Sequence, residues 1–284
     1  FQIMHILNGP GIFAYETGRY SGKSVTVKNF PNDILEDNDI SAGLDRPVLK
    51  SRKGDNTLLS FLGRVRYNYS GKYFATASLR RDGSSKFAQK HKYGFFPSFD
   101  AAWLISEEES IKNKSVISNL KLRASYGKTG NQSISSYQTL DRLSSTNAVV
   151  NGTLVSGFSN GNPTDPNLKW ETTSASDIGL DLGLFQNRLT LTADVYYKKT
   201  ENLLQNLLIP LSTGSSSYLT NYGTVTNKGL ELAVTAAIFS ERAFNWNVNA
   251  NISFNRNKIS GLNGDQFARR LWSGIDQVFI QRNG

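Results

Sequence analysis

A few short stretches of the sequence contain residue types that could bind a ligand or catalyse a reaction. Gly127-Lys128-Thr129 has the ending of a phosphate-binding loop. That motif requires a glycine five residues before its second glycine, and Leu122 occupies this position. The stretch also follows a strand pattern instead of leading into a helix. A turn at the end of a strand is the favoured interpretation, and we do not expect nucleotide binding.

The residues most often used in catalysis and in metal binding are scarce. The chain has two histidines, His5 and His91, and no cysteine. Both histidines lie in polar stretches that predict loops, and neither a nucleophile elbow nor a zinc motif accompanies them. The absence of cysteine excludes disulfides and thiolate metal sites. We therefore predict that the protein is not an enzyme and holds no cofactor.

Two stretches rich in carboxylate and amide oxygens are candidates for a Ca²⁺ site. They are Glu36-Asp37-Asn38-Asp39 and Asn160-Gly161-Asn162, the second followed by Asp165 and Asn167. Oxygen ligands suit a hard cation, but neither stretch has the spacing of an EF-hand loop. Solvated turns are the simpler interpretation, and Ca²⁺ in the loops is the alternative.

One long polar stretch, 131–170, has a composition suited to binding sugars or peptides. Tyr137, Phe158 and Trp170 stand there among many Asn, Ser and Thr residues. Aromatic rings offer flat apolar faces, and amides form hydrogen bonds with hydroxyls. Exposed loops in general share this composition. Tyr137 and Phe158 are therefore the candidate substrate-binding residues, and no others are singled out.

Strands must position these residues. The chain has 16 Phe and 12 Tyr but one Met, and together with abundant Ser, Thr and Asn this predicts an all-β fold. From Phe61 onward, eight segments of about ten residues alternate between apolar and polar side chains, as tilted transmembrane strands do. The eight segments are 61–69, 73–80, 95–105, 120–126, 177–182, 189–197, 230–238 and 244–255.

Charged residues in these segments fall on the side opposite to the apolar one. In the fourth segment, for example, Lys121 and Arg123 alternate with Leu120 and Leu122. Charges are costly in a dry core, but they suit a water-filled lumen or a surface that meets a polar plug. The residues predicted to face a lumen are Arg64, Arg66, Lys121, Arg123, Asp177, Asp181, Asp194 and Glu231.

The connections between the segments alternate in length. Tight turns are expected at Ser70-Gly71, Gln186-Asn187 and Ser240-Glu241-Arg242, and long links at 82–94, 130–169 and 200–225. A link of medium length, 106–118, falls on the short side and could contain a small helix over 107–114. Short turns at one end and long loops at the other favour an outer-membrane β-barrel over a soluble β-sandwich with one wet face, which is the alternative.

The chain divides into three parts on this pattern. We expect a loop-rich segment with partial strands over 1–56, barrel strands with long extracellular loops over 57–262, and an extracellular loop or the start of another strand over 263–284. The sequence contains no run of about 18 apolar residues, so it does not predict a membrane-spanning helix. Residues 1–10 lack the features of a signal peptide, so we expect a mature chain or a fragment.

The net charge of +9 does not point to nucleic acid. The Lys and Arg residues are scattered through the alternating segments, without a helix-turn-helix, zinc-finger or RNP-like pattern. Nucleic acid is therefore not an expected partner. The basic excess either meets lipopolysaccharide phosphates at the membrane surface or keeps the loops soluble.

Several motifs together resemble the barrel of SusC/RagA-type TonB-linked outer-membrane transporters of Bacteroidota. The resemblance covers about 30–261 and keeps the order of the family's motifs. The motifs are Leu-Arg-Arg-Asp-Gly-Ser-Ser-Lys-Phe at 79–87, Tyr-Gly-Phe-Phe-Pro-Ser at 93–98, Ala-Trp-Leu-Ile-Ser-Glu-Glu at 102–108, Asn-Leu-Lys-Leu-Arg-Ala-Ser-Tyr-Gly-Lys-Thr-Gly-Asn-Gln at 119–132, Asp-Pro-Asn-Leu-Lys-Trp-Glu at 165–171 and Asn-Lys-Gly-Leu-Glu-Leu at 227–232.

The resemblance implies a barrel of about 22 strands with an internal plug. It also implies import of oligosaccharides or peptides, powered through the TonB complex, with a SusD-like surface lipoprotein as a lid. The plug, the TonB-binding segment and the remaining strands have no counterpart in this sequence, so we expect a segment of a larger transporter. A stand-alone β-rich module that binds glycans or acts as an adhesin is the alternative function.

Overall fold

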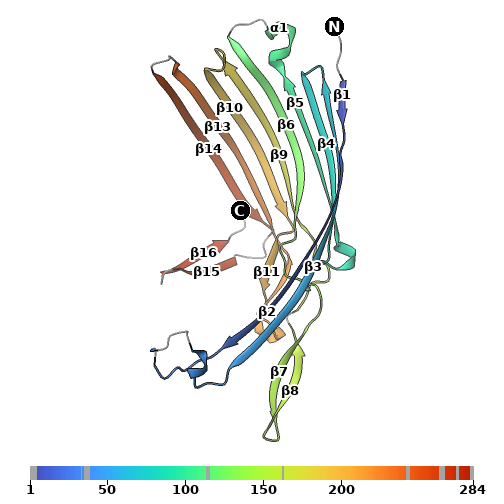
Figure 1. Cartoon of the computed structure of the whole chain (residues 1–284), viewed down its shortest axis with the longest axis vertical. Helices are drawn as coiled ribbons and strands as arrows, with labels where there is room; N and C mark the ends of the chain where they lie inside the picture. Colours follow the sequence, from blue (N-terminus) through green and yellow to red (C-terminus); the bar gives the residue numbers. More distant parts are fainter. Residues whose placement is uncertain are drawn as a thin grey trace.

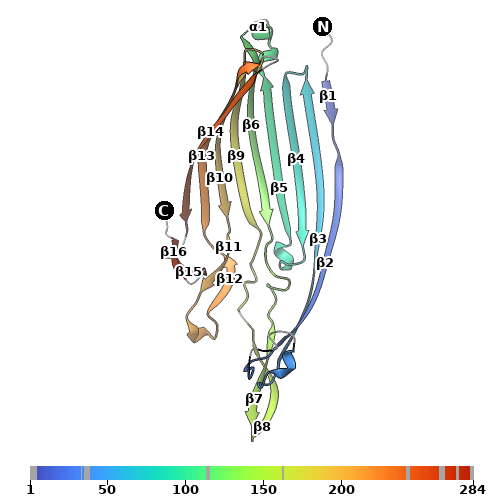
Figure 2. The same ribbon diagram turned by 60° about the vertical axis from the view of Figure 1, so that its left-hand side comes forward.

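The protein is built around one curved antiparallel sheet, shown from two directions in Figures 1 and 2. The computed structural model describes residues 5–32, 34, 39–112, 116–161, 163–240, 244–261, 266–272 and 275–281. Within these residues, no helix is long and apolar enough to cross a membrane. The sheet runs in the order β1-β3-β4-β5-β6-β9-β10-β13-β14, and β2 also pairs with β3.

The sheet strands are long, and each of the eight predicted segments lies within or closely overlaps one of them. Their bounds are β1 His5–Asn8, β2 Gly11–Thr26, β3 Val48–Tyr69, β4 Tyr73–Ser84, β5 Tyr93–Leu104, β6 Ile117–Asn131, β9 Glu171–Leu184, β10 Leu189–Glu201, β13 Thr224–Ser240 and β14 Asn245–Ser260. The prediction of an all-β antiparallel fold is confirmed.

The edge beside β3 differs from the loop-rich segment expected over 1–56. β1 and β2 pair with β3 in one continuous register, because Asn8 lies opposite Arg66 and Gly11 opposite Gly63. Between them Pro10 has no N–H to donate, but its carbonyl accepts from the Arg64 N–H at 3.1 Å. Most residues of β2 and of the first half of β3 are exposed, on both faces. Their alternation is weak because both faces contact water there.

Cross-strand register gives the sheet two distinct faces. One row of directly paired residues is apolar across eight strands: Tyr67, Ala75, Ala101, Ala124, Ile178, Val195, Leu230 and Phe254. The adjacent row on the other face is mostly polar: Arg66, Thr76, Asp100, Ser125, Asp177, Tyr196, Gly229 and Asn255. Most of the apolar row is exposed. A sheet with this pattern needs lipid on its apolar face.

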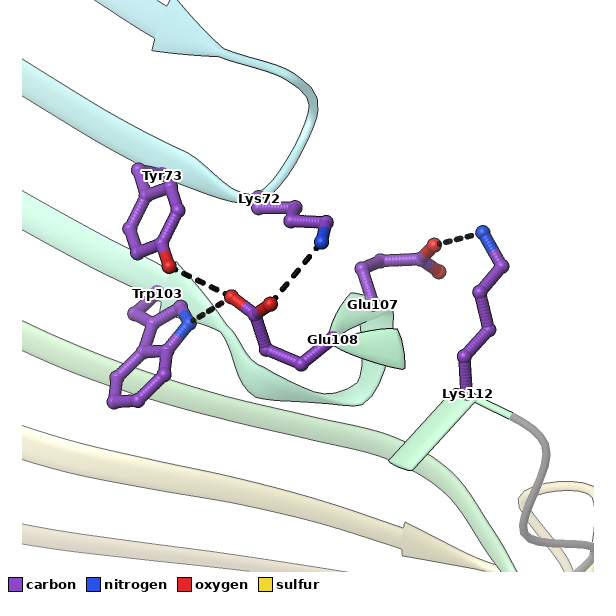
Figure 3. A network of polar contacts seen from close by, with 6 residues as sticks. All are labelled: Lys72, Tyr73, Trp103, Glu107, Glu108 and Lys112. Carbon is purple, nitrogen blue, oxygen red and sulfur yellow. Dashed lines mark hydrogen bonds and ion pairs between the residues drawn. The ribbon is translucent and has the colours of Figure 1, made fainter. Parts of the chain in front are cut away.

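Short connections occupy one end of the sheet. The predicted small helix is present as a 3-10 turn at Ile105–Glu107 followed by α1, Glu109–Lys112. Between them the Glu108 carboxylate accepts hydrogen bonds from Tyr73 Oη at 2.7 Å, Trp103 Nε1 at 3.1 Å and Lys72 Nζ at 3.1 Å (Figure 3). This carboxylate ties the β5–β6 connection to the β3–β4 turn.

The long connections occupy the opposite end and contain hairpins that the strand pattern did not predict. They are β7 Leu143–Val150 with β8 Thr153–Asn160, and β11 Leu204–Leu208 with β12 Ser217–Asn221. The β7–β8 hairpin projects beyond the sheet in Figures 1 and 2. A third hairpin, β15 Gln266–Trp272 with β16 Ile275–Gln281, lies in the segment expected to be a loop or the start of a strand.

Candidate functional site

The polar face of the sheet carries all eight charged residues predicted from the sequence to face a lumen. Arg66 and Asp177 belong to the polar row given above, and Arg64 is two residues from Arg66 on β3, which places it on the same face. A second row joins Arg123 through Gly179 to Asp194 and Glu231. A third row on this face pairs Lys121 with Asp181. The register establishes that these eight residues share one face of the sheet. Further strands would be needed to close a barrel around a lumen.

Arg123 is the centre of an ion-pair network on this face. Its Nε donates to Asp181 Oδ2 at 2.8 Å and its Nη2 to Asp181 Oδ1 at 3.1 Å. Nη2 also donates to Asp194 Oδ1 at 2.9 Å. Three strands, β6, β9 and β10, are thereby joined through one guanidinium. The buried Gly179 leaves room for it, because a Cβ at that position would lie 2.6 Å from Arg123 Nη2.

Where the long loops begin, a hydrophobic cluster covers part of the polar face. Phe96 is on the polar side of β5, since it precedes Ser98 and Asp100 by two and four residues. It packs with four buried residues contributed by the loops: Phe87, Ile134, Leu168 and Trp170. This is the buried apolar core of the described residues, and it holds loops against the sheet. Sequence analysis did not predict this cluster.

The stretch 165–171 fastens several loops together, and we call it the loop lock. Leu168 is fully buried, and Trp170 Nε1 donates to the Lys92 carbonyl at 3.0 Å. Asp165 Oδ2 accepts from the Thr220 hydroxyl at 2.5 Å, and the Lys169 N–H donates to Asn221 Oδ1 at 2.8 Å. At its end, Glu171 accepts from Asn131 Nδ2 at 3.0 Å and from the Leu204 N–H at 3.0 Å. The loop lock therefore binds the 85–92 loop and the β11–β12 hairpin.

The two candidate substrate-binding residues lie on different elements. The Tyr137 hydroxyl donates to the Asp55 carboxylate on β3, and its ring is 39% exposed. Phe158 is on the projecting hairpin, 77% exposed. The structure does not bring these two rings into contact. Tyr137 also has a φ of 62°, so its backbone is left-handed, which is uncommon for a residue with a Cβ.

A polar cleft of about 590 Å³ lies between the base of the β7–β8 hairpin and the 3-10 turn Leu211–Thr213. Its lining includes Asp141, Arg142 and Asn160. Asp141 Oδ1 also accepts from the Thr164 hydroxyl at 2.5 Å. Sequence reasoning did not find this cleft, since its walls come from two separate loops.

His5 and the Gly127-Lys128-Thr129 stretch occupy positions that differ from those expected, whereas His91 does not. His5 is on strand β1, with Nδ1 2.7 Å from the Tyr67 hydroxyl, and not in a loop. His91 does lie in a loop, in the 3-10 turn Gln89–His91. The Gly127 stretch continues β6, with Lys128 opposite Ser174, so it forms neither the expected turn nor a phosphate-binding loop.

The acidic stretches are partly outside the described residues: 36–38 and 162 are not described. Asp39 caps the 3-10 turn Ile40–Ala42, and hydrogen bonds from the Ser41 hydroxyl and N–H lower the pKa of its carboxyl. Asp165 accepts from the Asn167 N–H at 2.8 Å in addition to Thr220. Within the part of the chain that is described, three or more His, Asp or Glu side chains do not gather at a metal-binding distance. The Ca²⁺ alternative stays untested.

Comparison with known proteins agrees with this geometry. The β-barrel model of TonB-dependent receptors matches residues 7–275. TonB-dependent receptor P26 of Formosa agariphila is 42% identical over 237 residues, which is 83% of this chain and 24% of that protein. TonB-dependent receptor SusC of Bacteroides thetaiotaomicron is 36% identical over 74% of this chain and 21% of that protein. This chain thus spans about a quarter of the length of these relatives.

A solved structure of the RagAB peptide transporter superposes with a TM-score of 0.77 at 26% identity, covering 92% of this chain and 29% of that one. The exposed apolar face, the polar opposite face and the two unequal ends therefore define part of an outer-membrane β-barrel. The chain belongs to the TonB-dependent receptor family and is of the SusC/RagA type. The relatives are receptors and transporters by name, which supports the prediction that the protein is not an enzyme.

Proposed function

We propose that this chain forms part of the wall of an importer that moves oligosaccharides or peptides across the outer membrane. The observation that carries the proposal is the polar sheet face with its Arg123 network, which opposes a continuous apolar face. Such a face suits the lumen of a large barrel. A stand-alone adhesin would instead leave the apolar rows in water, which is unfavourable for so large a surface.

A plug domain is the partner that the polar face supports. Arg64 Nε is buried and makes no hydrogen bond within the described residues. Buried donors of this kind normally have an acceptor, and a polar plug surface against this face would supply one. The plug and the contact with the TonB complex belong to the part of the receptor outside this chain.

A SusD-like surface lipoprotein is the proposed partner at the long-loop end. The loop lock gives this end a fixed platform, and the β7–β8 hairpin extends from it with exposed Leu143, Val149 and Phe158. An isolated two-stranded hairpin is at best marginally stable in water, so contact with a partner would stabilise it. We expect the transported molecule to contact Tyr137, Phe158 and the polar cleft lined by Asp141, Arg142 and Asn160.

Deletion of the complete receptor gene and uptake of labelled substrates test the proposal. We expect the deletion strain to lose uptake of one class of oligosaccharide or of peptide, and the full-length gene to restore it. A tagged full-length receptor should also co-purify a surface lipoprotein. The same deletion should be made in a strain that lacks any second receptor of this type. If uptake of every oligosaccharide and peptide tested is then unchanged, the proposed import function is refuted.

A further inference from the structure

Two cations face each other on the lipid-facing side of the sheet. Lys228 on β13 and Arg256 on β14 are direct cross-strand partners. Both alternate with apolar residues of the lipid-facing rows, since Leu230 and Phe254 form the neighbouring pair on that face. Lys258 is two residues beyond Arg256 and shares the face. All three cations are exposed.

Like charges directly opposite each other in a sheet are destabilising unless an anion lies between them. Within the described residues, no carboxylate forms an ion pair with Lys228, Arg256 or Lys258. On the same face of the adjacent strand β10, Glu201 pairs with Lys199 at 2.6 Å. The three cations therefore lack an acidic partner from this part of the chain.

The cations also border a hollow. A depression of about 330 Å³ has Lys228 and Arg256 in its lining, together with the apolar Val195, Leu230 and Phe254. The register places the three apolar residues on the bilayer side of the two cations. The site thus combines an apolar hollow with a cationic rim, the complement of an acyl chain that ends in an anionic headgroup.

The depth of Lys228 and Arg256 in the membrane matches the outer boundary of the bilayer. Trp246 lies at the short-turn end of β14, and Arg256 is ten positions further along the strand. At about 3.4 Å per residue they span about 34 Å of strand. At a tilt of about 40° this is about 26 Å of depth, close to the apolar band of about 25 Å in outer-membrane barrels. Arg256 and Lys228 therefore reach the level of the outer-leaflet headgroups.

We propose that Lys228, Arg256 and Lys258 bind the phosphate of a phosphorylated glycolipid in the outer leaflet, with one of its acyl chains in the hollow between Val195, Leu230 and Phe254. Phosphate oxygens would separate the two facing cations and supply the missing negative charge. The inference rests on the outer-membrane placement and not on import, so a receptor that imports neither substrate class would leave it standing.

Lipid binding to the full-length receptor tests the site. The probes are lipid A with one phosphate and the same lipid without phosphate, each added to delipidated receptor in detergent and counted by native mass spectrometry. We expect the phosphorylated form to bind, and the double variant K228Q/R256Q to weaken its binding at least about tenfold, as the loss of charge-assisted hydrogen bonds predicts. The control K90Q/K198Q removes the same charge from a loop and from the polar face, and should bind as the wild type does.

A second variant keeps both cations. Val195→Trp fills the hollow at a lipid-exposed position, where a larger apolar side chain should not disturb folding, and is expected to weaken binding severalfold. Equal binding of the two lipids would show contact through acyl chains alone and would overturn the proposal. So would wild-type affinity in K228Q/R256Q, or displacement of the lipid by an acidic peptide that binds the same cations more tightly.

Discussion

The guanidinium of Arg123 and the carboxylate of Asp181 are joined by two hydrogen bonds, of 2.8 and 3.1 Å, across the boundary between β6 and β9. These strands are adjacent in the sheet, but the long 132–170 loop separates them in the sequence. Asp194 of β10 accepts a further hydrogen bond from the same guanidinium. One guanidinium thus bridges two carboxylates, and the three side chains come from three neighbouring strands.

Removal of the Arg123 cation should destabilise the receptor more than removal of one of its carboxylate partners. Arg123→Gln leaves Asp181 and Asp194 facing each other without a cation, whereas Asp181→Asn leaves Arg123 paired with Asp194. The side chains are about a third exposed or less, so we expect Arg123→Gln to destabilise the full-length receptor by about 1–2 kcal/mol, less than a fully buried pair would lose. Thermal unfolding in detergent measures it, with Lys198→Gln as the control. A larger loss for Asp181→Asn would contradict this account.

Gly179 should not tolerate a side chain. A Cβ there would lie 2.3 Å from Asp194 Oδ1 and 2.6 Å from Arg123 Nη2, so the network must shift to admit it. We expect Gly179→Ala to lower stability by about 1–3 kcal/mol, the usual cost of overpacking. Gly63→Ala is the matched control, because a Cβ at Gly63 meets nothing within 4 Å. Equal melting temperatures for the two variants would count against the packing described.

Trp170 should control how firmly the extracellular loops are held. Trp170→Ala empties the centre of the buried cluster, where large-to-small changes cost about 3–5 kcal/mol. Trp170→Phe keeps a ring but loses the hydrogen bond to the Lys92 carbonyl, worth about 1 kcal/mol. Protease cleavage of loops on intact cells should rise strongly in the first variant and slightly in the second. Leu44→Ala, at a loop side chain that is 76% exposed, should leave cleavage unchanged, and an equal effect of all three would refute the loop lock.

Acid should weaken the connection between β5 and β6. The hydrogen bond from Tyr73, followed by those from Lys72 and Trp103, lowers the pKa of the Glu108 carboxyl. Its folded pKa is thus below the unfolded value of about 4.3. The resulting stabilisation is present above that value and is lost as the pH falls through the folded pKa.

Thermal unfolding of the full-length receptor between about pH 3 and pH 7 checks this sign. Glu108→Gln should be less stable than the wild type at neutral pH, and the difference should shrink toward the acid end of the range. Glu109→Gln, an exposed neighbour, provides the control. A difference that grows on acidification would mean that the carboxylate is not the stabilising form.

The sequence alone was sufficient for the sheet strands that cross the bilayer. Alternation such as that from Phe244 to Asn255 predicts a strand with one apolar and one polar face, because a one-residue shift would exchange the two faces. It also placed the eight charged residues on one face. The same rule gave only partial strands over 1–56 and not the full length of β2, since a strand that is solvated on both faces has no reason to alternate.

Only the tertiary structure decided which loop residues meet. Trp170 and Phe158 both appear as aromatic residues in one polar loop, yet the first is buried beneath Lys92 and the second projects into solvent. Likewise Lys228 and Arg256, 28 positions apart, become neighbours through the register of β13 and β14. Side-chain alternation is a local property of a strand and can be predicted from sequence. Contacts between distant segments depend on strand register and loop packing, which no local pattern of residues specifies.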